Sequence, residues 1–322
     1  MKNQFYKFYI PLVLFLFFVL AGENMMAQQD ARYSQYMFNS LLINPAYAGS
    51  TGKANVSAFY RTQWVGLDGA PTSITLSGNG ALGDGDQIGV GGFLEYDKVG
   101  LHNTWRVFGT YAYHLKIGSG KLGIGLQAGG TLFSADLSQA NPTEVPGSDD
   151  PVFQNDLSRF LPNFGVGLYY HTPAFYAGVS VPQLVTNRLK SGESSISLVG
   201  KQYRHYFFTA GVVIEASESF KIIPSTLIKA VPIQAPTQMD FNVNLMFRDA
   251  FWVGSSVRFS EEFDAESLDF LLGFQLKNGL RIGYSYDLTL SDLADFNNGS
   301  HEVGVGFDFG SDDRRYVTPR FF

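Results

Sequence analysis

Fourteen short segments of alternating apolar and polar residues run through the chain, and this alternation most constrains what it can fold into. Successive side chains of a β-strand point to opposite faces. In residues 268–276, leucine or phenylalanine occupies every second position, whereas Asp269 and Gln275 belong to the other face. The pattern predicts an all-β protein whose strands each have one apolar face and one polar face.

The connections between these segments also alternate, one short and the next long. The short ones are rich in Gly, Asn, Asp and Pro, as tight turns are, whereas residues 134–160 and 182–203 form long connections. Transmembrane barrels have short periplasmic turns and long external loops, so we expect an antiparallel up-and-down β-barrel of about 14 strands with a periplasmic N-terminus. The predicted strands are 53–62, 71–81, 87–97, 103–116, 121–133, 161–171, 174–181, 204–216, 220–231, 238–248, 251–259, 267–277, 279–288 and 300–310.

A soluble β-sandwich gives the same alternation, and the distribution of aromatic residues distinguishes the two. A sandwich packs its apolar faces into a core, whereas a membrane barrel turns them to lipid, with aromatic girdles at both interfaces and a polar lumen. The apolar faces of this chain carry many rings near segment ends, and the opposite faces are rich in Gly, Ser and Thr, which favours the barrel. The rings assigned to the lipid face are Tyr60, Trp64, Trp105, Tyr111, Tyr113, Tyr170, Tyr176, Tyr206, Phe251, Tyr284, Tyr286 and Phe309.

The first 27 residues have the features of a secretory signal peptide. Lys2 and Lys7 form a basic start, an apolar run follows, and Ala27 offers a cleavage point before Gln28. Removing this leader changes 23 basic and 29 acidic residues to 21 and 28, a net charge of −7. A mildly acidic protein is a poor partner for nucleic acid, and the absence of cysteine excludes thiol chemistry and disulfides.

Charges of both signs are predicted to face the lumen. Mixed charges suit ion pairs across a narrow barrel better than a selectivity filter of one sign, so we expect a closed or plugged barrel. The charged residues assigned to the lumen are Glu95, Arg106, Glu215, Lys229, Asp240, Arg248, Arg258, Asp269, Arg281, Glu302 and Asp308.

Two segments outside the barrel, 28–52 and 311–322, are distinctive. In the first, aromatic residues could share one face of a helix that ends at Asn44-Pro45, and we expect it to plug or cap the periplasmic mouth, or else to contact a partner. The second has three arginines and an aromatic end, and it is either a loosely ordered periplasmic tail or a docking segment. The candidate partner-contact or plug residues are Tyr33, Tyr36, Phe38, Asn44, Pro45, Tyr47, Arg314, Arg315, Arg320 and Phe322.

The chain therefore divides into a signal peptide (1–27), a periplasmic plug or cap (28–52), a barrel (53–310) and a periplasmic tail (311–322). We expect no catalytic, cofactor or metal site, and so no enzyme. The five histidines lack metal-ligand spacing, and no G-x-S-x-G motif occurs, although a lipase could assemble Ser and His from neighbouring strands. The glycine-rich run 123–128 lies within a predicted strand, where it should bind no phosphate. Asp149, Asp150 and Asp156 could bind calcium, but a solvated loop is the simpler interpretation.

Both ends of the mature chain resemble one protein family. The run Tyr-Ser-Gln-Tyr-Met-Phe-Asn from Tyr33, followed by Ile-Asn-Pro-Ala-Tyr-Ala-Gly ending at Gly49, closely resembles the start of the PorP/SprF family of Bacteroidetes outer-membrane proteins. The final Pro-Arg-Phe-Phe is similar to that family's C-terminus, and Ser40 stands where many relatives have Pro. The resemblance implies the outer membrane and the type IX secretion and gliding-motility machinery.

The resemblance also implies a non-enzymatic role as partner, anchor or export factor for a large secreted surface protein or adhesin, in contact with type IX components and outer-membrane lipid. The alternative is an outer-membrane transport channel for small or hydrophobic solutes. The mixed lumen charges and the N-terminal segment argue against an open porin.

Overall fold

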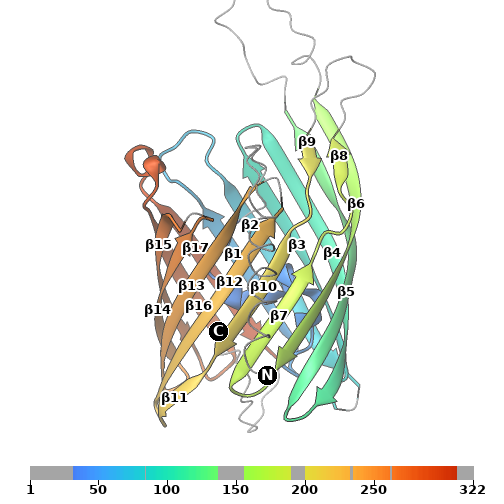
Figure 1. Cartoon of the computed structure of the whole chain (residues 1–322), viewed down its shortest axis with the longest axis vertical. Helices are drawn as coiled ribbons and strands as arrows, with labels where there is room; N and C mark the ends of the chain where they lie inside the picture. The colour runs from blue at the N-terminus through green and yellow to red at the C-terminus, as the bar shows by residue number, and fades with distance from the viewer. Residues whose placement is uncertain are drawn as a thin grey trace, which may run out of the picture.

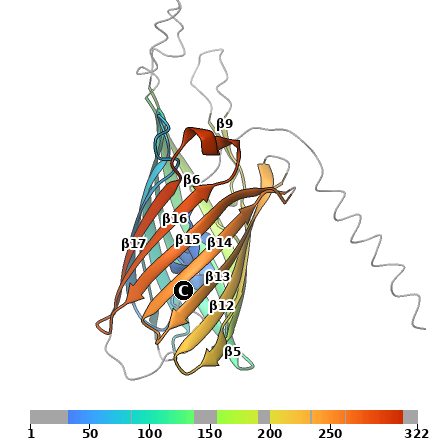
Figure 2. The ribbon, with the colours of Figure 1, turned by 90° about the vertical axis from the view of Figure 1, so that its left-hand side faces the viewer.

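The protein is a β-barrel, seen in a computed structural model that describes residues 32–83, 85–136, 156–189, 200–232, 235–261 and 263–309 (Figures 1 and 2). The expected signal peptide and the tail from 311 lie outside the described residues. The described strands are β1 (Asn55–Thr62), β2 (Thr72–Leu82), β3 (Ile88–Val99), β4 (His102–Ile117), β5 (Gly120–Ala135), β6 (Leu157–His171), β7 (Phe175–Val181), β8 (Asn187–Leu189), β9 (Gly200–Gln202), β10 (Tyr206–Val212), β11 (Ile214–Ser217), β12 (Phe220–Val231), β13 (Ala235–Phe247), β14 (Phe251–Phe259), β15 (Ala265–Gln275), β16 (Leu280–Thr289) and β17 (Ser300–Asp308).

Each predicted strand is present, and the ends agree to within three residues except that β6 begins four residues early, at Leu157. The segment predicted at 204–216 is interrupted at Val213, and its two parts, β10 and β11, both pair with β12. Counted as one strand, they give fourteen wall strands in the described residues, each antiparallel to its neighbours. The barrel closes where β1 pairs with β17, so the predicted fold is confirmed.

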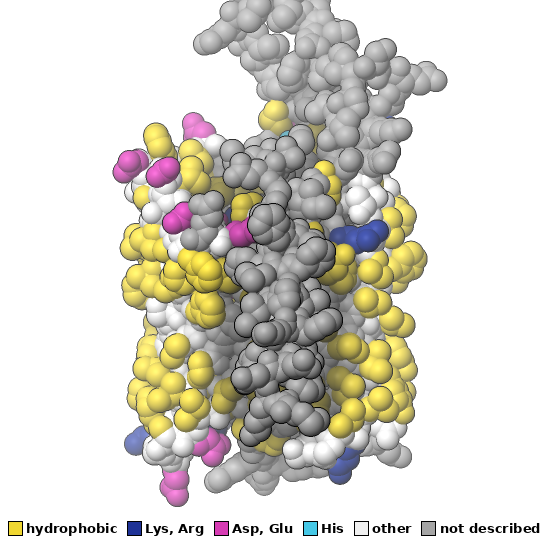
Figure 3. Space-filling model, viewed as in Figure 1, with side chains coloured by type: hydrophobic (Ala, Val, Ile, Leu, Met, Phe, Trp, Pro, Cys, Tyr) yellow, Lys and Arg dark blue, Asp and Glu magenta, His cyan; other side chains and the backbone are white. Residues whose placement is uncertain are grey.

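The side chains of the wall alternate between lipid and lumen as predicted. On β15, Leu272 is 40% exposed, whereas Asp269 is fully buried. On the face shown in Figure 3, apolar side chains predominate over the middle of the described wall, and many charged side chains lie near its two ends. Among the rings assigned to the lipid face, Tyr176 is a correction: it lies inside, because Phe175 starts β7 with its own ring outward and the next residue must face the lumen.

All connections at one end of the barrel are short, whereas the long connections lie at the other end, together with short ones after β3, β12 and β14 (Figure 1). We call these the short-turn end and the long-loop end. At the short-turn end, the expected turn at Asn278-Gly279 has Gly279 at a φ of 92°, which favours glycine. At the long-loop end, the structure adds two elements that the sequence patterns did not predict: the β8–β9 hairpin and the 3₁₀ turn η5 (Asp292–Phe296).

The segment before β1 lies inside the barrel (Figures 1 and 2). The single helix expected there is instead three short turns: η1 (Tyr36–Phe38), α2 (Ser40–Ile43) and η2 (Pro45–Tyr47). Pro45 lacks the N–H that would continue a helix and disfavours helical backbone at Asn44, so α2 ends at Ile43. Among the described residues, no helix is long and apolar enough to span a membrane.

Candidate functional site

Residues 32–52 run through the lumen, and we call this segment the plug. Its first residue, Arg32, donates to Glu266 at 2.8 Å near the start of β15, in the long-loop half. Its last residues, Ser50 to Gly52, line a hollow with His171 at the short-turn end. The segment therefore fills the lumen along its length rather than only capping one mouth.

A buried charge cluster holds the upper part of the plug, which is the part nearer the long-loop end. The carboxylate of Glu302 accepts the backbone N–H groups of Ser34 and Gln35 at 3.0 and 3.1 Å. Arg61 lies directly across the β1–β17 ladder and donates to the same carboxylate at 3.2 Å. Charge-assisted bonds of this kind are the stronger class of hydrogen bond, so they fix the plug backbone to the wall.

Asp287 on β16 completes this cluster. It accepts from Ser34 Oγ at 2.6 Å and from Arg61 Nη2 at 2.5 Å. The side chains of Arg61, Asp287 and Glu302 are at most 4% exposed. A charge withdrawn from water to this degree must be paired, and here the pairing joins three wall strands to the plug.

Large apolar side chains hold the middle of the plug. Tyr36, Met37 and Ile43 pack against a patch of the inner wall, and the Phe38 ring lies 5.1 Å from that of Trp252. The expected small and polar lumen is therefore interrupted where the plug docks. The wall residues of this apolar patch are Ile223, Leu227, Met246, Trp252 and Leu271.

Close approach to glycine holds the lower part of the plug. Asn44 caps η2 by accepting the N–H of Ala46 at 2.9 Å and donates to the carbonyl of Leu168 at 2.9 Å. A Cβ at Gly125 would overlap the backbone of Ala46, and one at Gly167 would overlap the Asn44 side chain. Only glycine leaves this space. The Asn-Pro-Ala motif of the plug therefore requires glycine at the facing positions of the wall.

Further contacts fix the end of the plug from Tyr47 onward. The ring nitrogen Nε2 of His114 lies 2.8 Å from the Ala48 carbonyl and donates to it, because a carbonyl only accepts. Gly49 N–H donates to Asn79 at 3.0 Å, and the Tyr47 ring meets Tyr169 edge-on at 5.5 Å. These contacts fix the position of the chain where it leaves the lumen and continues to β1.

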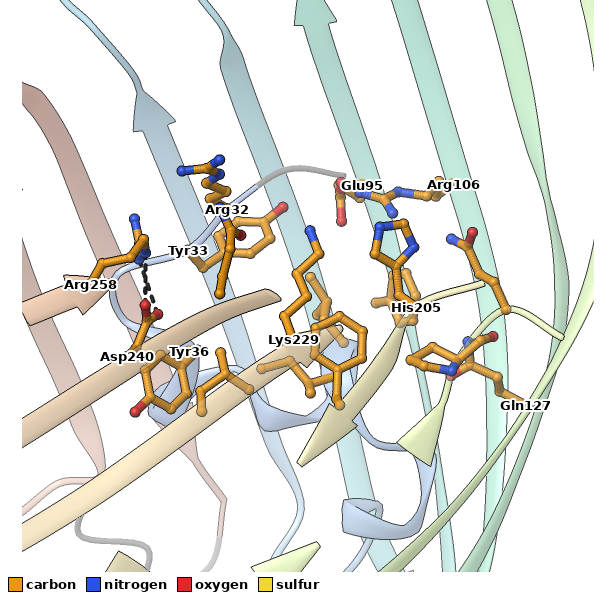
Figure 4. A pocket seen from close by; sticks show the side chains of 18 residues that line it. Arg32, Tyr33, Tyr36, Glu95, Arg106, Gln127, His205, Lys229, Asp240 and Arg258 are labelled. Atoms are coloured by element: carbon orange, nitrogen blue, oxygen red, sulfur yellow. Dashed lines mark hydrogen bonds and ion pairs between the residues drawn. The ribbon is translucent and has the colours of Figure 1, made fainter. Parts of the chain in front are cut away.

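A small chamber of about 80 Å³ remains beside the plug (Figure 4). Tyr36, Leu42 and Ile43 line it from the plug, and Lys229 and His205 point toward the side where Glu95 and Arg106 lie. Around it, Arg106 pairs with Glu95, and Arg258 pairs with Asp240 at 2.8 Å. The chamber therefore has an apolar floor and charged walls.

The predicted lumen charges need two corrections. Glu95–Arg106 and Asp240–Arg258 join neighbouring strands rather than crossing the barrel. Arg61–Asp287 reaches only from β1 past β17 to β16. Arg248 and Glu215 are exposed, Arg248 because it sits in the turn after β13 with a φ of 53°. Mixed-sign pairing is present, but the plug is what fills the barrel.

The predicted contact residues Tyr33, Tyr36, Phe38, Asn44, Pro45 and Tyr47 all lie in the plug. The other four, Arg314, Arg315, Arg320 and Phe322, are outside the described residues, as are Asp149 and Asp150. Sequence reasoning missed Arg61 and Asp287 as plug contacts. Their position on the polar face of β1 and β16 was the available signal. Within the described ranges, no group of His, Cys, Asp or Glu could hold a metal ion.

Solved structures similar to the chain are outer-membrane barrels of low sequence identity. The CymD monoaromatic hydrocarbon channel aligns with a TM-score of 0.52 and 11% identity over 89% of this chain and 95% of that one. Omp33 of Acinetobacter baumannii aligns with a TM-score of 0.45 and 10% identity, covering 80% and 98% of the two chains. The likeness to CymD shows the fold alone.

Sequence comparison gives the family. No curated protein matches the chain significantly. The family described as "Type IX secretion system membrane protein PorP/SprF" matches residues 25–307, which include the plug and nearly all of the barrel. The chain is thus an outer-membrane β-barrel that belongs to the PorP/SprF family of type IX secretion system membrane proteins.

Proposed function

We propose that this barrel is a non-enzymatic membrane platform that serves type IX secretion as partner, anchor or export factor for a secreted surface protein, such as an adhesin. The observation that carries the proposal is the plug. Tyr36 and Met37 are each 3% exposed inside the lumen, and buried charges fix the same segment to the wall. A lumen filled in this way leaves the rims, loops and outer wall as the surfaces that can hold another polypeptide.

Conductance separates this proposal from a transport channel. The runner-up function, passage of small or hydrophobic solutes, has one supporting observation in the chamber beside the plug. In planar bilayers the platform should show no steady open-channel current, because the plug fills the lumen. A steady large current through the wild-type protein would favour transport instead.

The tail 311–322 supplies the test of partner contact. It adds residues beyond β17, which ends at Asp308, and it is rich in arginine and aromatic residues, which are enriched at interfaces. Truncation after Gly310 should leave a folded, heat-modifiable barrel in the membrane and should reduce surface display of the partner. A truncated chain that fails to assemble would make the tail an insertion signal and end this assignment.

The platform also needs an orientation, and we propose that the long-loop end faces outward. Ser291 and Ser219 are both exposed, at the long-loop end and the short-turn end respectively. Because the chain has no cysteine, S291C should react with an impermeant maleimide on intact cells, and S219C should react only after the outer membrane is opened. The reverse result would invert the proposed topology.

A further inference from the structure

The outer wall has a hollow of about 590 Å³ over β5, β6, β7, β10 and β12. No charged residue lines it, and the surrounding face of the barrel meets lipid. A closed barrel wall is ordinarily convex on this side. The side chains that shape the hollow include Leu126, Val166, Val179, Val181, Tyr206 and Phe208.

The hollow lies directly behind the lower seat of the plug. Gly125 and Gly167 line the hollow from the wall, and on the inner side the same two glycines meet Ala46 and Asn44. Ser180 also lines the hollow, and its hydroxyl donates to the Ile43 carbonyl at 2.6 Å. A single backbone layer without inward side chains at the two glycines therefore separates the hollow from the plug.

The wall is also thin at the upper edge of the hollow. β7 ends at Val181, and the next residues turn inward, where Gln127 Nε2 donates to the Pro182 carbonyl at 2.8 Å. Phe207 lines both the hollow and the chamber beside the plug. Gly125 and Gly167 lie on the long strands β5 and β6, but the next two strands of the hollow, β7 and β10, are only seven residues long.

We propose that the hollow binds one acyl chain of an outer-membrane lipid, and that this chain supports the wall patch holding the plug. Three features select this occupant. Hydrocarbon is the medium around the wall, and an empty hollow would forfeit dispersion contacts. A flexible chain fits between strand side chains, whereas a helix is about 10–12 Å across. Tyr206 and Phe208, 42% and 39% exposed, add aromatic rings against which a hydrocarbon chain can pack.

The first test compares two valine-to-tryptophan variants on the lipid face. Val179 lies in the hollow and Val303 lies on β17 away from it, with similar exposure of 47% and 43%. Native mass spectrometry of the protein extracted in mild detergent should find one retained lipid on the wild type and on V303W, and about tenfold less on V179W. Heat-modifiable migration in gels checks that each variant is folded.

The second test measures how readily maleimide reaches the plug. In a Ser40→Cys background, delipidated protein should react with maleimide faster than protein given back dioleoylphosphatidylethanolamine. V303W should show the same lipid effect. V179W should react slowly with or without lipid, because its indole fills the hollow. Absence of retained lipid on the wild type, equal retention by both tryptophan variants, or an identical lipid effect on Ser40→Cys labelling in all three would overturn the proposal. So would a co-purifying polypeptide that V179W loses in place of lipid.

Discussion

The two ends of the plug are held by opposite means. At the upper end, Ser34 and Gln35 meet a cluster of buried charges. At the lower end, Asn44 and Ala46 lie against glycines with no room for another atom. The upper end depends on charged side chains, and the lower end depends on glycines that have no Cβ atom. We therefore expect the upper end to be sensitive to deletion of a side chain and the lower end to addition of one.

The largest effect should come from removing Arg61. In Arg61→Ala, Asp287 and Glu302 lose their buried cation, and breaking a buried pair costs about 3–5 kcal/mol. Urea unfolding of the barrel in detergent measures this loss of unfolding free energy. The control is Lys221→Ala, because Lys221 pairs with Asp249 at a surface where Asp249 is 47% exposed and such pairs contribute about 0–1 kcal/mol. Equal losses in the two variants would refute the role assigned to the charge cluster.

The glycine seat should give the next effect. A methyl group at Gly125 would overlap the backbone of Ala46, and overpacking of this kind costs about 1–3 kcal/mol. Gly109, on the neighbouring strand β4, has no atom within 4 Å of its would-be Cβ. Gly109→Ala should therefore be neutral or slightly stabilising, since alanine loses less backbone entropy than glycine. If both alanine variants unfold at the same urea concentration, the wall glycines are not a seat for the plug.

The smallest effect should come from Asn44→Ala. The side chain caps η2 and donates to the wall at Leu168, and loss of such a cap costs about 1 kcal/mol. Because the loss is local, the rate at which a cysteine at position 40 reacts with maleimide should rise more clearly than global stability falls. An unchanged labelling rate would mean that the glycines hold the lower end without Asn44.

The strands could be predicted from the sequence because each is specified locally. Alternation fixes which residues share a face, so Asp269 and Leu272 were assigned to opposite sides correctly. The prediction was wrong at Tyr176, Glu215 and Arg248, which lie next to strand ends. There a shift of one residue reverses the face, and the turn decides the register.

The contacts of the plug could not be predicted in the same way. Arg61 lies on β1, whereas Asp287 and Glu302 lie on β16 and β17, near the other end of the chain. Ser34 contacts all three only because the barrel closes. Nothing in the local pattern indicated that Trp252 or Ile223 would face inward to pack against the plug. The β8–β9 hairpin was missed because its strands are three residues long, too short to show a period.

The sequence by itself determined the barrel, its approximate number of strands, its lipid face and its resemblance to the PorP/SprF family. Strand alternation and turn residues depend on neighbouring positions in the chain, so they can be predicted from the sequence. The tertiary structure decided that the N-terminal segment runs through the lumen, which charges hold it, and why the wall carries glycine at 125 and 167. Those features depend on closure of β1 against β17, which brings together residues more than 200 positions apart in the chain.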